Sequence, residues 1–388
     1  QPVVHIAGTN GKGSVLAILD AILRAAGYRT GRFTSPHLLD VSERFLVNGL
    51  PIEDAALCAQ IAFFRDIAAG FDAPPTYFEL CTAIAFRHFA QSGVDAALIE
   101  TGMGGRLDST NVVSPAATAI VTIDFDHTRY LGDTLEAIAG EKAGIVKPGV
   151  PVVIGETKPD PLRVLENTAQ ERGAPALVLG RDFDCAVEGP VWDQRVTYTG
   201  PHWPIAAAPL RLAGRHQAAN ASVALALAGI LQPTFPRLDE RAVREGLAHA
   251  VWPCRLERVL DEPTVILDAA HNAAGARRLA EALEGDYALV LAVSEDKDAA
   301  AMLEALAPRA HPLVLTTFAN ARARTVESLR ALAGGIPHRA APDMTAAIEE
   351  GFRWAGADKP LVIAGSIFAV AEARHHLCER YGAYSLRF

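Results

Sequence analysis

The fold is decided near the start of the chain, where the apolar run Val3–Ala7 (VVHIA) leads directly into Gly8–Ser14 (GTNGKGS). Apolar residues at helical spacing follow over Val15–Ala26, so the order is strand, glycine-rich loop, helix. Glycines let several backbone N–H groups point at one anion, and the start of a helix adds partial positive charge. Lys12 would add a full charge for the β- and γ-phosphates, and Ser14 a hydroxyl for Mg²⁺. The stretch therefore predicts a nucleotide site in an α/β domain.

This loop departs from the usual pattern G-x-x-x-x-G-K-[ST]. Ile6 stands where the first glycine belongs, and Gly13 separates Lys12 from Ser14. The alternative is a glycine-rich turn that caps a helix and leaves Lys12 solvated. We favour the nucleotide site because the flanking strand and helix are both in place.

Strands and helices alternate along most of the chain. In the last third, short runs rich in Val, Ile and Leu are separated by segments of helical spacing, and these runs are 264–268, 288–293, 311–318 and 360–364. The first half alternates in the same way, with strands expected at 96–100, 118–123 and 151–155 and helices at 78–89, 134–143 and 217–231. Such alternation is typical of right-handed crossovers in a mostly parallel sheet.

Two departures from this alternation suggest how the chain is divided. Residues 177–213 contain Pro and Gly breaks and favour antiparallel hairpins. The segment Trp252–Arg255 is where we place a hinge. We therefore expect an ATPase domain over 1–258 and a smaller Rossmann-like α/β domain over 259–388.

Composition excludes several classes of protein. The 36 Lys and Arg residues against 45 Asp and Glu give a net charge of −9, so a broad basic surface for nucleic acid is not expected. No stretch is apolar enough to cross a membrane. The five cysteines form an odd number without a C-x-x-C pair, which indicates reduced thiols and a cytoplasmic protein.

Acidic residues stand at the ends of two expected strands. Glu100 closes the strand 96–100, and Asp124, Asp126 and His127 follow the strand 118–123. A carboxylate at the C-terminal end of a strand in an α/β sheet lies beside the ligand crevice. The alternative for Glu100 is a turn or helix-capping carboxylate, and a lone His is more often structural than a ligand. Mg²⁺ also prefers oxygen to imidazole.

Beyond the loop, eight segments resemble the folylpolyglutamate synthase/dihydrofolate synthase family of Mur-type ATP-dependent ligases, in the same order. They are Thr34–Leu38 (TSPHL), Tyr77–Glu79 (YFE), Glu100–Asp108 (ETGMGGRLD), Asp126–His127 with Leu131–Gly132, Glu141–Ile145 (EKAGI), His216–Asn220 (HQxxN), Trp252–Glu257 (WPxRLE) and Leu267–Asn272 (LDxxHN). These segments span almost the whole chain. The resemblance implies a P-loop-containing, Mur-ligase-like ATPase domain followed by the Rossmann-like domain.

The resemblance also implies roles for single residues. The magnesium ligands would be Ser14, Glu100 and His127. The ATP-binding residues would be Asn10, Gly11, Lys12, Gly13, Ser14, Asn220, Arg255 and Asp268. The substrate would contact Ser35, Thr76, Phe78, Asp108 and His271. Lys12, Lys142 and His271 would act in catalysis, with Lys142 carbamylated and facing a second Mg²⁺.

Simpler interpretations stay open for several of these residues. On the sequence alone Lys142 passes for a solvated helix lysine. Asn220 could serve in helix capping or core hydrogen bonding, as could His216. Phe78 could pack in the core, and the loop Thr34–Leu38 could be an ordinary surface connection.

The predicted reaction is the ATP-dependent addition of L-glutamate to dihydropteroate, to a reduced folate, or to both, through an acyl phosphate. We expect a monomer that binds these small molecules and neither nucleic acid nor membrane. One alternative is a cell-wall Mur ligase with a UDP-linked substrate, although such enzymes carry a further N-terminal domain and here the phosphate strand begins at Val3. The others are a P-loop kinase or ATPase that forms no amide bond, and a non-catalytic nucleotide-binding protein.

Overall fold

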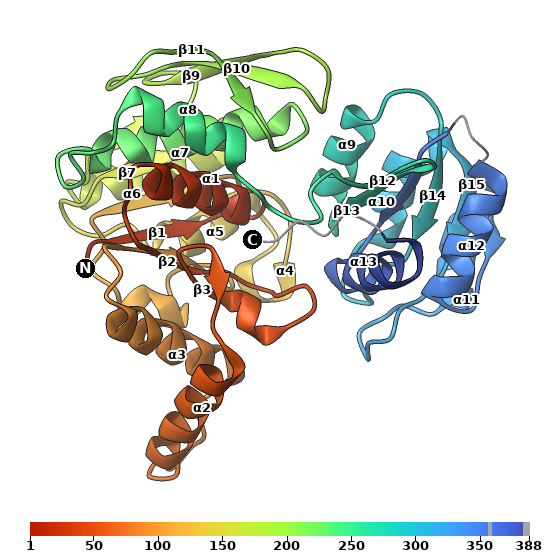
Figure 1. Ribbon diagram of the computed structural model, residues 1–388, viewed down its shortest axis with the longest axis horizontal. Coiled ribbons are helices and arrows are strands. Elements are labelled where there is room, and N and C mark those ends of the chain that lie inside the picture. Colours follow the sequence, from red (N-terminus) through yellow and green to blue (C-terminus); the bar gives the residue numbers. More distant parts are fainter. Residues whose placement is uncertain (356–358, 383–388) are drawn as a thin grey trace. The chain divides into compact units, whose positions relative to one another are not determined.

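A computed structural model describes residues 1–355 and 359–382 (Figure 1). The chain divides into two compact units. The first comprises Gln1–Arg211 and Arg215–Val251, and the second takes in Leu212–Gly214 and the chain from Trp252 onwards. The segment expected as a hinge thus lies at the start of the second unit.

The first unit is built on an eight-stranded sheet of order β4-β3-β2-β5-β1-β6-β7-β8. Its strands are β1 (Val3–Ala7), β2 (Thr30–Phe33), β3 (Phe45–Val47), β4 (Leu50–Pro51), β5 (Ala96–Glu100), β6 (Ala117–Ile120), β7 (Val152–Ile154) and β8 (Ala176–Val178). Six neighbouring strands of this sheet are parallel, namely β2, β5, β1, β6, β7 and β8. At the edge beyond β2, β3 and β4 are antiparallel. The alternation of strands and helices predicted this parallel sheet correctly.

Helices cover both sides of this sheet. α1 (Lys12–Ala25), α7 (His216–Leu231) and α8 (Glu240–His249) pack together on one side, and α3 (Tyr77–Ser92) lies on the other (Figure 1). The remaining helices of the unit are α2 (Asp54–Ala68), α4 (Thr128–Leu131), α5 (Leu135–Ala143) and α6 (Pro159–Glu171), with the 3-10 turns η1 (Val41–Arg44) and η2 (Ser109–Val112). α7 is rich in Ala and buried along most of its length, so its small side chains allow close packing on two sides.

A small antiparallel sheet completes the first unit, as the breaks in residues 177–213 predicted. It consists of β9 (Asp184–Glu188), β10 (Gln194–Thr199) and β11 (Ile205–Leu210) in the order β11-β10-β9. Along β10, buried Gln194, Val196 and Tyr198 alternate with more exposed residues, because successive side chains point to opposite faces of a sheet.

The second unit has a six-stranded sheet of order β12-β13-β17-β14-β15-β16. The strands are β12 (Glu257–Asp261), β13 (Thr264–Asp268), β14 (Tyr287–Leu291), β15 (Ala310–Leu315), β16 (Arg339–Ala340) and β17 (Leu361–Ala364). Its helices are α9 (Ala273–Ala282), α10 (Ala299–Leu306), η3 (Ala307–Arg309), α11 (Val326–Ala333), α12 (Met344–Ala355) and α13 (Ile367–Tyr381). All strands but β12 are parallel, which confirms the α/β architecture expected for the last third.

Sheet topology places three loops of the first unit side by side. β1 lies between β5 and β6, with Ile6 opposite both Glu100 and Ala119. The carboxyl ends of parallel strands share one edge, so the loops after β1, β5 and β6 meet there. The strand predicted over 118–123 ends earlier, at Ile120. Beyond it, the Thr122 carbonyl accepts a hydrogen bond from the loop after β1 rather than from a neighbouring strand.

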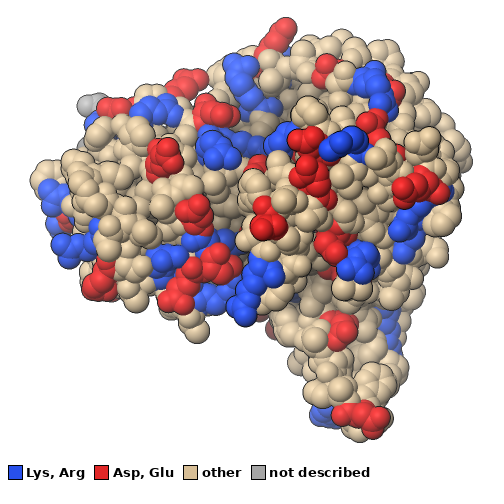
Figure 2. Space-filling view, turned by 180° about the vertical axis from the view of Figure 1, so that it is seen from behind, with Lys and Arg blue, Asp and Glu red and all other residues tan. Residues whose placement is uncertain are grey.

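The surface carries charges of both signs. On the face seen in Figure 2, acidic and basic side chains are interspersed over either unit, without a broad basic area. No helix within the described residues is long and apolar enough to cross a membrane.

Candidate active site

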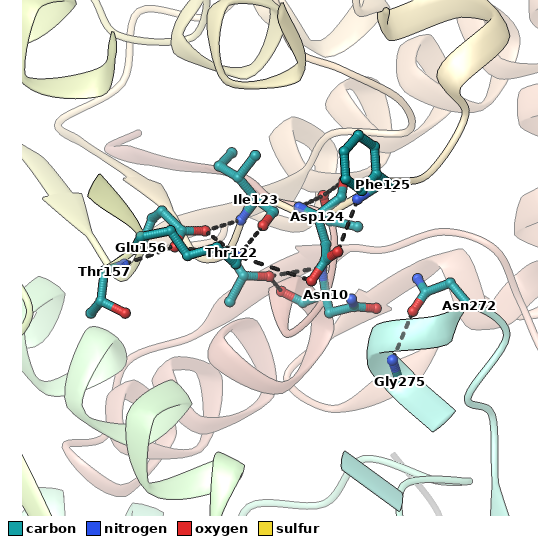
Figure 3. Close-up of polar contacts among 11 residues, drawn as sticks. Asn10, Thr122, Ile123, Asp124, Phe125, Glu156, Thr157, Asn272 and Gly275 are labelled. Carbon is teal, nitrogen blue, oxygen red and sulfur yellow. Dashed lines mark hydrogen bonds and ion pairs between the residues drawn. The ribbon is translucent and has the colours of Figure 1, made fainter. Parts of the chain in front are cut away.

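The loop after β1 is held in shape by the segment that follows β6 (Figure 3). The Thr9 backbone N–H donates to the Thr122 carbonyl at 2.7 Å, and the Asn10 N–H donates to the Thr122 hydroxyl at 3.1 Å. That hydroxyl donates in turn to the Asn10 carbonyl at 3.0 Å. The Thr9 hydroxyl accepts from the Asp124 N–H at 3.0 Å and donates to the Asp124 carbonyl at 3.1 Å. Protein hydrogen bonds therefore fix the loop.

Gly11 shows that this loop has room for backbone only. Its φ is +88°, a left-handed conformation that favours glycine. A Cβ at this position would lie 2.4 Å from Oδ1 of Asn220 and 2.9 Å from Cγ1 of Val121. The Asn220 amide donates to Oε1 of Gln217 at 2.8 Å, one turn earlier in α7. The structure thus brings Asn220 against the glycine loop.

A lysine, a carboxylate and a hydroxyl lie at the mouth of the loop. The Lys12 ammonium donates to the Gly8 carbonyl at 3.0 Å and lies 3.7 Å from Oε1 of Glu100. Oε2 of Glu100 accepts from the Ser35 N–H at 3.0 Å. Glu100 and Ser14 are both buried, at 4% and 2% exposure. The loop with its lysine, Ser35 and the Glu100 carboxylate come from three segments far apart in the sequence.

These residues fit a nucleotide-bound magnesium ion. Among the residues that the structure describes, no group of three or more His, Cys, Asp and Glu side chains could hold a metal ion. Mg²⁺ in nucleotide sites binds one or two protein carboxylates, phosphate oxygens and water, so it needs no such group. The Glu100 carboxylate and the Ser14 hydroxyl supply oxygens of the required kind.

His127 is held beside an acid. Its Nε2 lies 3.9 Å from Oδ2 of Asp126, and its backbone N–H donates to Oδ1 of the same residue at 2.9 Å. Its φ of +51° is a left-handed conformation that costs energy for a residue with a side chain. The local geometry therefore presents the imidazole from a strained position at the start of α4.

Lys142 is buried, in contrast to the solvated lysine that the sequence alone suggests. Only 4% of it is exposed, near the end of α5. Burial is the main cause that lowers its pKa from 10.5 to about 7, and the charge of Lys12 lowers it further. Asp126 and Asp108 partly oppose this shift. A large fraction of the amine is therefore neutral and nucleophilic near pH 7.

The expected substrate residues of the first unit also support local structure. Thr76 caps α3, accepting from the Glu79 N–H at 3.3 Å. The Phe78 ring fills the space beside Gly102, where a Cβ would lie 2.5 Å from it. Asp108 caps η2 through the Thr110 N–H at 3.0 Å and also accepts from the Met103 N–H at 2.9 Å.

These substrate residues lie on adjoining elements. The Thr82 hydroxyl of α3 is 2.8 Å from the Ser109 hydroxyl of η2, so the two elements are in direct contact. The residues Thr76, Phe78 and Asp108 therefore border one region of the first unit.

In the second unit, Asp268 anchors the chain at the start of that unit. Its two oxygens accept from the Leu256 and Ala270 N–H groups, both at 2.8 Å. Burial raises the pKa of this carboxyl, while the charge of Arg255 lowers it. Arg255 donates to the carbonyl of its neighbour Cys254, whose φ of +56° is a left-handed conformation that favours glycine.

His271 follows three residues after Asp268, and its Nδ1 lies 2.9 Å from the Ala269 carbonyl. The next residue, Asn272, caps α9 by accepting from the Gly275 N–H at 2.8 Å (Figure 3). His271 is therefore oriented by the same turn that starts α9.

Sequence reasoning missed the residues that hold the loops in place. Thr122 is the main partner of the glycine loop, yet it reads as an ordinary strand residue. Glu156, only 3% exposed, accepts from the N–H groups of Thr157 and Lys158 at 2.9 and 2.7 Å and from that of Ile123 (Figure 3). Their one signal is a polar side chain directly after an apolar strand.

The fold and the site define a Mur-type ligase. The Mur ligase middle domain matches residues 6–228, and the Mur ligase glutamate ligase domain matches residues 254–367. The chain is 35% identical to the dihydrofolate synthase/folylpolyglutamate synthase of Bacillus subtilis, over 96% of this chain and 90% of that protein. It belongs to the dihydrofolate synthase/folylpolyglutamate synthase family.

Solved structures agree with this assignment. The folylpolyglutamate synthase of Mycobacterium tuberculosis, complexed with ADP, superposes with a TM-score of 0.90 at 37% identity, covering 96% of this chain and 90% of that one. The bifunctional folylpolyglutamate synthase/dihydrofolate synthase of Yersinia pestis, complexed with AMPPNP and a Mn ion, gives 0.87 at 32% identity, with coverage of 97% and 88%. The resemblance stated from the sequence is therefore confirmed.

Proposed function

We propose that this protein is an ATP-dependent ligase that joins L-glutamate to the carboxylate of dihydropteroate, of a reduced folate, or of both. The observation that carries the proposal is the glycine loop held against Thr122 and Asn220, with Lys12 and Glu100 at its mouth. The relatives support it, because they are named for these activities and two of their structures hold ADP or AMPPNP.

The first chemical step is phosphoryl transfer. Backbone N–H groups of Gly11–Ser14 bind the phosphates, and the Lys12 ammonium neutralises charge on the γ-phosphoryl group as it moves to the substrate carboxylate. Ser14, Glu100 and His127 would hold Mg²⁺, which would supply further positive charge to the phosphates. The products are ADP and an acyl phosphate.

Amide formation follows. The neutral amine of L-glutamate attacks the acyl carbon, the C–O bond to phosphate breaks, and phosphate leaves with its electron pair as the amine loses a proton. An acyl phosphate hydrolyses readily, so the site must exclude water. We assign His271 to the amino-acid end of the reaction, Asn220, Arg255 and Asp268 to the nucleotide, and Ser35, Thr76, Phe78 and Asp108 to the pterin substrate.

We further propose that Lys142 is carbamylated. A pKa of about 7 supports this, because CO₂ reacts with the neutral amine. The product is an anion that would face a second Mg²⁺ or orient the phosphate. Short carboxylic acids should restore activity to Lys142→Ala if the carbamate supplies a negative charge, and wild-type rates in the unrescued variant would contradict the modification.

We propose that the protein works as a cytoplasmic monomer on small molecules. The five cysteines are free, as is usual in reducing compartments. Gel filtration coupled to light scattering would test the monomer.

The central test is ADP release by the purified protein with ATP, Mg²⁺, L-glutamate and either dihydropteroate or tetrahydrofolate. Release should require both glutamate and one of the two acceptors, whereas a kinase or ATPase would need no amino acid. Lys12→Ala should abolish it, and Lys359→Ala, which changes a partly buried lysine of the second unit, should not. Glutamate-independent release at the full rate would overturn the proposal.

A further inference from the structure

Arg44 is a nearly buried arginine without an acidic partner. It ends η1 and is 7% exposed. Its Nε donates to Nδ1 of His37 at 3.0 Å, and its guanidinium carbon lies 5.3 Å from the centre of the Tyr77 ring. Among the residues that the structure describes, no carboxylate oxygen lies within 4.0 Å of its guanidinium nitrogens. A buried positive charge without a counter-ion is costly, so it indicates a place for an anion.

The two acids nearest to Arg44 in sequence are already engaged. Glu43 accepts from the N–H groups of Leu38, Leu39 and Asp40 at 2.7, 3.0 and 3.1 Å. Asp40 accepts from the Ser42 N–H at 2.8 Å, and its hydrogen bonds from Ser42 lower the pKa of its carboxyl. Together they form the capping box that starts η1. Neither can turn to Arg44 without leaving backbone N–H groups unsatisfied.

Arg44 has hydrogen-bond donors left for an anion. The terminal nitrogens of Arg44 donate to no described residue and are not sealed from solvent. Because Nδ1 of His37 accepts from Arg44, Nε2 carries the proton of the neutral ring. Burial lowers the pKa of His37, as does the charge of Arg44, while Glu43 and Asp40 oppose the shift. The exposed Tyr77 ring lies beside the guanidinium, and its hydroxyl interacts with the Cys81 thiol. The planar guanidinium, with its terminal nitrogens unengaged by described residues, suits a carboxylate.

Arg44 is joined to the active site on two sides. Its carbonyl accepts from the Thr34 N–H at 3.4 Å, and the next residue, Ser35, donates to Glu100 at 3.0 Å. On the other side, Tyr77 lies between Thr76 and Phe78, the residues assigned to the pterin substrate. The positive charge of Arg44 therefore lies next to the residues that we assign to the substrate.

We propose that Arg44, oriented by His37 and lying beside the Tyr77 ring, binds the second carboxylate of a folate substrate. The inference rests on the proposed function. A folate ends in a glutamate with two carboxylates, of which one is phosphorylated while the other stays charged. Dihydropteroate has only the carboxylate that reacts. A cation at this position therefore favours folates over dihydropteroate, and Arg44 is a residue that sets specificity.

The test compares Arg44→Gln with wild type in ADP-release assays, using tetrahydrofolate and dihydropteroate. A charge-assisted hydrogen bond contributes about 1.5–3 kcal/mol, so kcat/KM for tetrahydrofolate should fall about tenfold to a hundredfold relative to that for dihydropteroate. The loss should lie mainly in KM, and Arg44→Lys should recover part of it. Arg65→Gln, an exposed arginine on α2, is the matched control and should leave the ratio unchanged.

If Arg44→Gln folds poorly, a modified substrate still tests the inference with the wild-type protein. The tetrahydropteroyl conjugate of 4-aminobutyrate keeps the reacting carboxylate and lacks the second one. Wild type should use this conjugate about tenfold less well than tetrahydrofolate, and Arg44→Gln should not distinguish them. Equal use of both by wild type, or an equal loss by the variant with both acceptors, would overturn the inference. Absence of activity with every acceptor in wild type would instead contradict the proposed function.

Discussion

The buried amine of Lys142 makes a quantitative prediction about stability and pH. Its pKa is about 7 in the folded chain against the usual 10.5. Below pH 7 both folded and unfolded chains bind the proton, and the folded chain bears the full cost of a buried charge. Between pH 7 and 10.5 the unfolded chain binds more protons than the folded one. Stability therefore rises with pH through this window.

Replacing Lys142 by Met removes this proton linkage. With the two pKa values above, the lysine destabilises the fold by about 4 kcal/mol at pH 7 and about 2 kcal/mol at pH 9. Lys142→Met should thus be more stable than wild type at pH 7, and its advantage should shrink by about 2 kcal/mol at pH 9. The change in this stability difference between pH 7 and pH 9 is a firmer prediction than its value at either pH. Packing differences between Lys and Met are the same at both pH values and therefore cancel.

Urea unfolding of both proteins at pH 7 and pH 9, in CO₂-free buffer without nucleotide or Mg²⁺, measures this difference. Added bicarbonate should stabilise wild type and leave Lys142→Met unchanged if the amine is carbamylated. Lys359→Met is the matched control, because this lysine is only partly buried and its ammonium donates to the His311 carbonyl. A stability difference between wild type and Lys142→Met that stays constant from pH 7 to pH 9 would refute the shifted pKa.

Three further substitutions test other parts of the structure. Gly11→Ala should weaken ATP binding about tenfold or more by calorimetry, because its Cβ would displace the Asn220 side chain, whereas Gly173→Ala adds a Cβ with no neighbour within 4 Å and should bind normally. Thr110→Val should cost about 2 kcal/mol in urea unfolding, because its buried hydroxyl joins a histidine at 2.8 Å to an aspartate. Glu257→Gln breaks a buried ion pair with Arg374 and should cost about 3 kcal/mol of stability, and a loss below 1 kcal/mol would contradict the pair.

Local sequence was sufficient for the architecture and the glycine loop. The loop follows its strand and precedes its helix without interruption, so every residue that shapes it, apart from Asn220 and the segment 121–124, is a close neighbour in sequence. The strands of the second unit are short apolar runs between helices, and such a pattern has few alternative folds.

The electrostatics of the site depend on contacts that only the folded chain makes. Lys142 is an ordinary helix residue until α5 is packed against the sheet. Arg44 follows Glu43, and in the sequence the two resemble an exposed ion pair. In the fold, the Glu43 carboxylate belongs to the capping box of η1 instead. Asp108 was expected from resemblance alone, but its bonds to Met103 and Thr110 arise from a turn in the loop after β5. These features are tertiary, so residue spacing does not contain them.

The buried position of Lys142 makes its state depend on the charges around it. As an ammonium group it is disfavoured by burial and by the charge of Lys12, and both lower its pKa. As a carbamate it would carry the opposite charge, so the same Lys12 would attract it. Phosphates bound at Lys12 would weaken that attraction, and the positive charge of a bound divalent ion would restore it. The buried lysine therefore fits a site that is completed by nucleotide and metal together, since neither alone balances its charge.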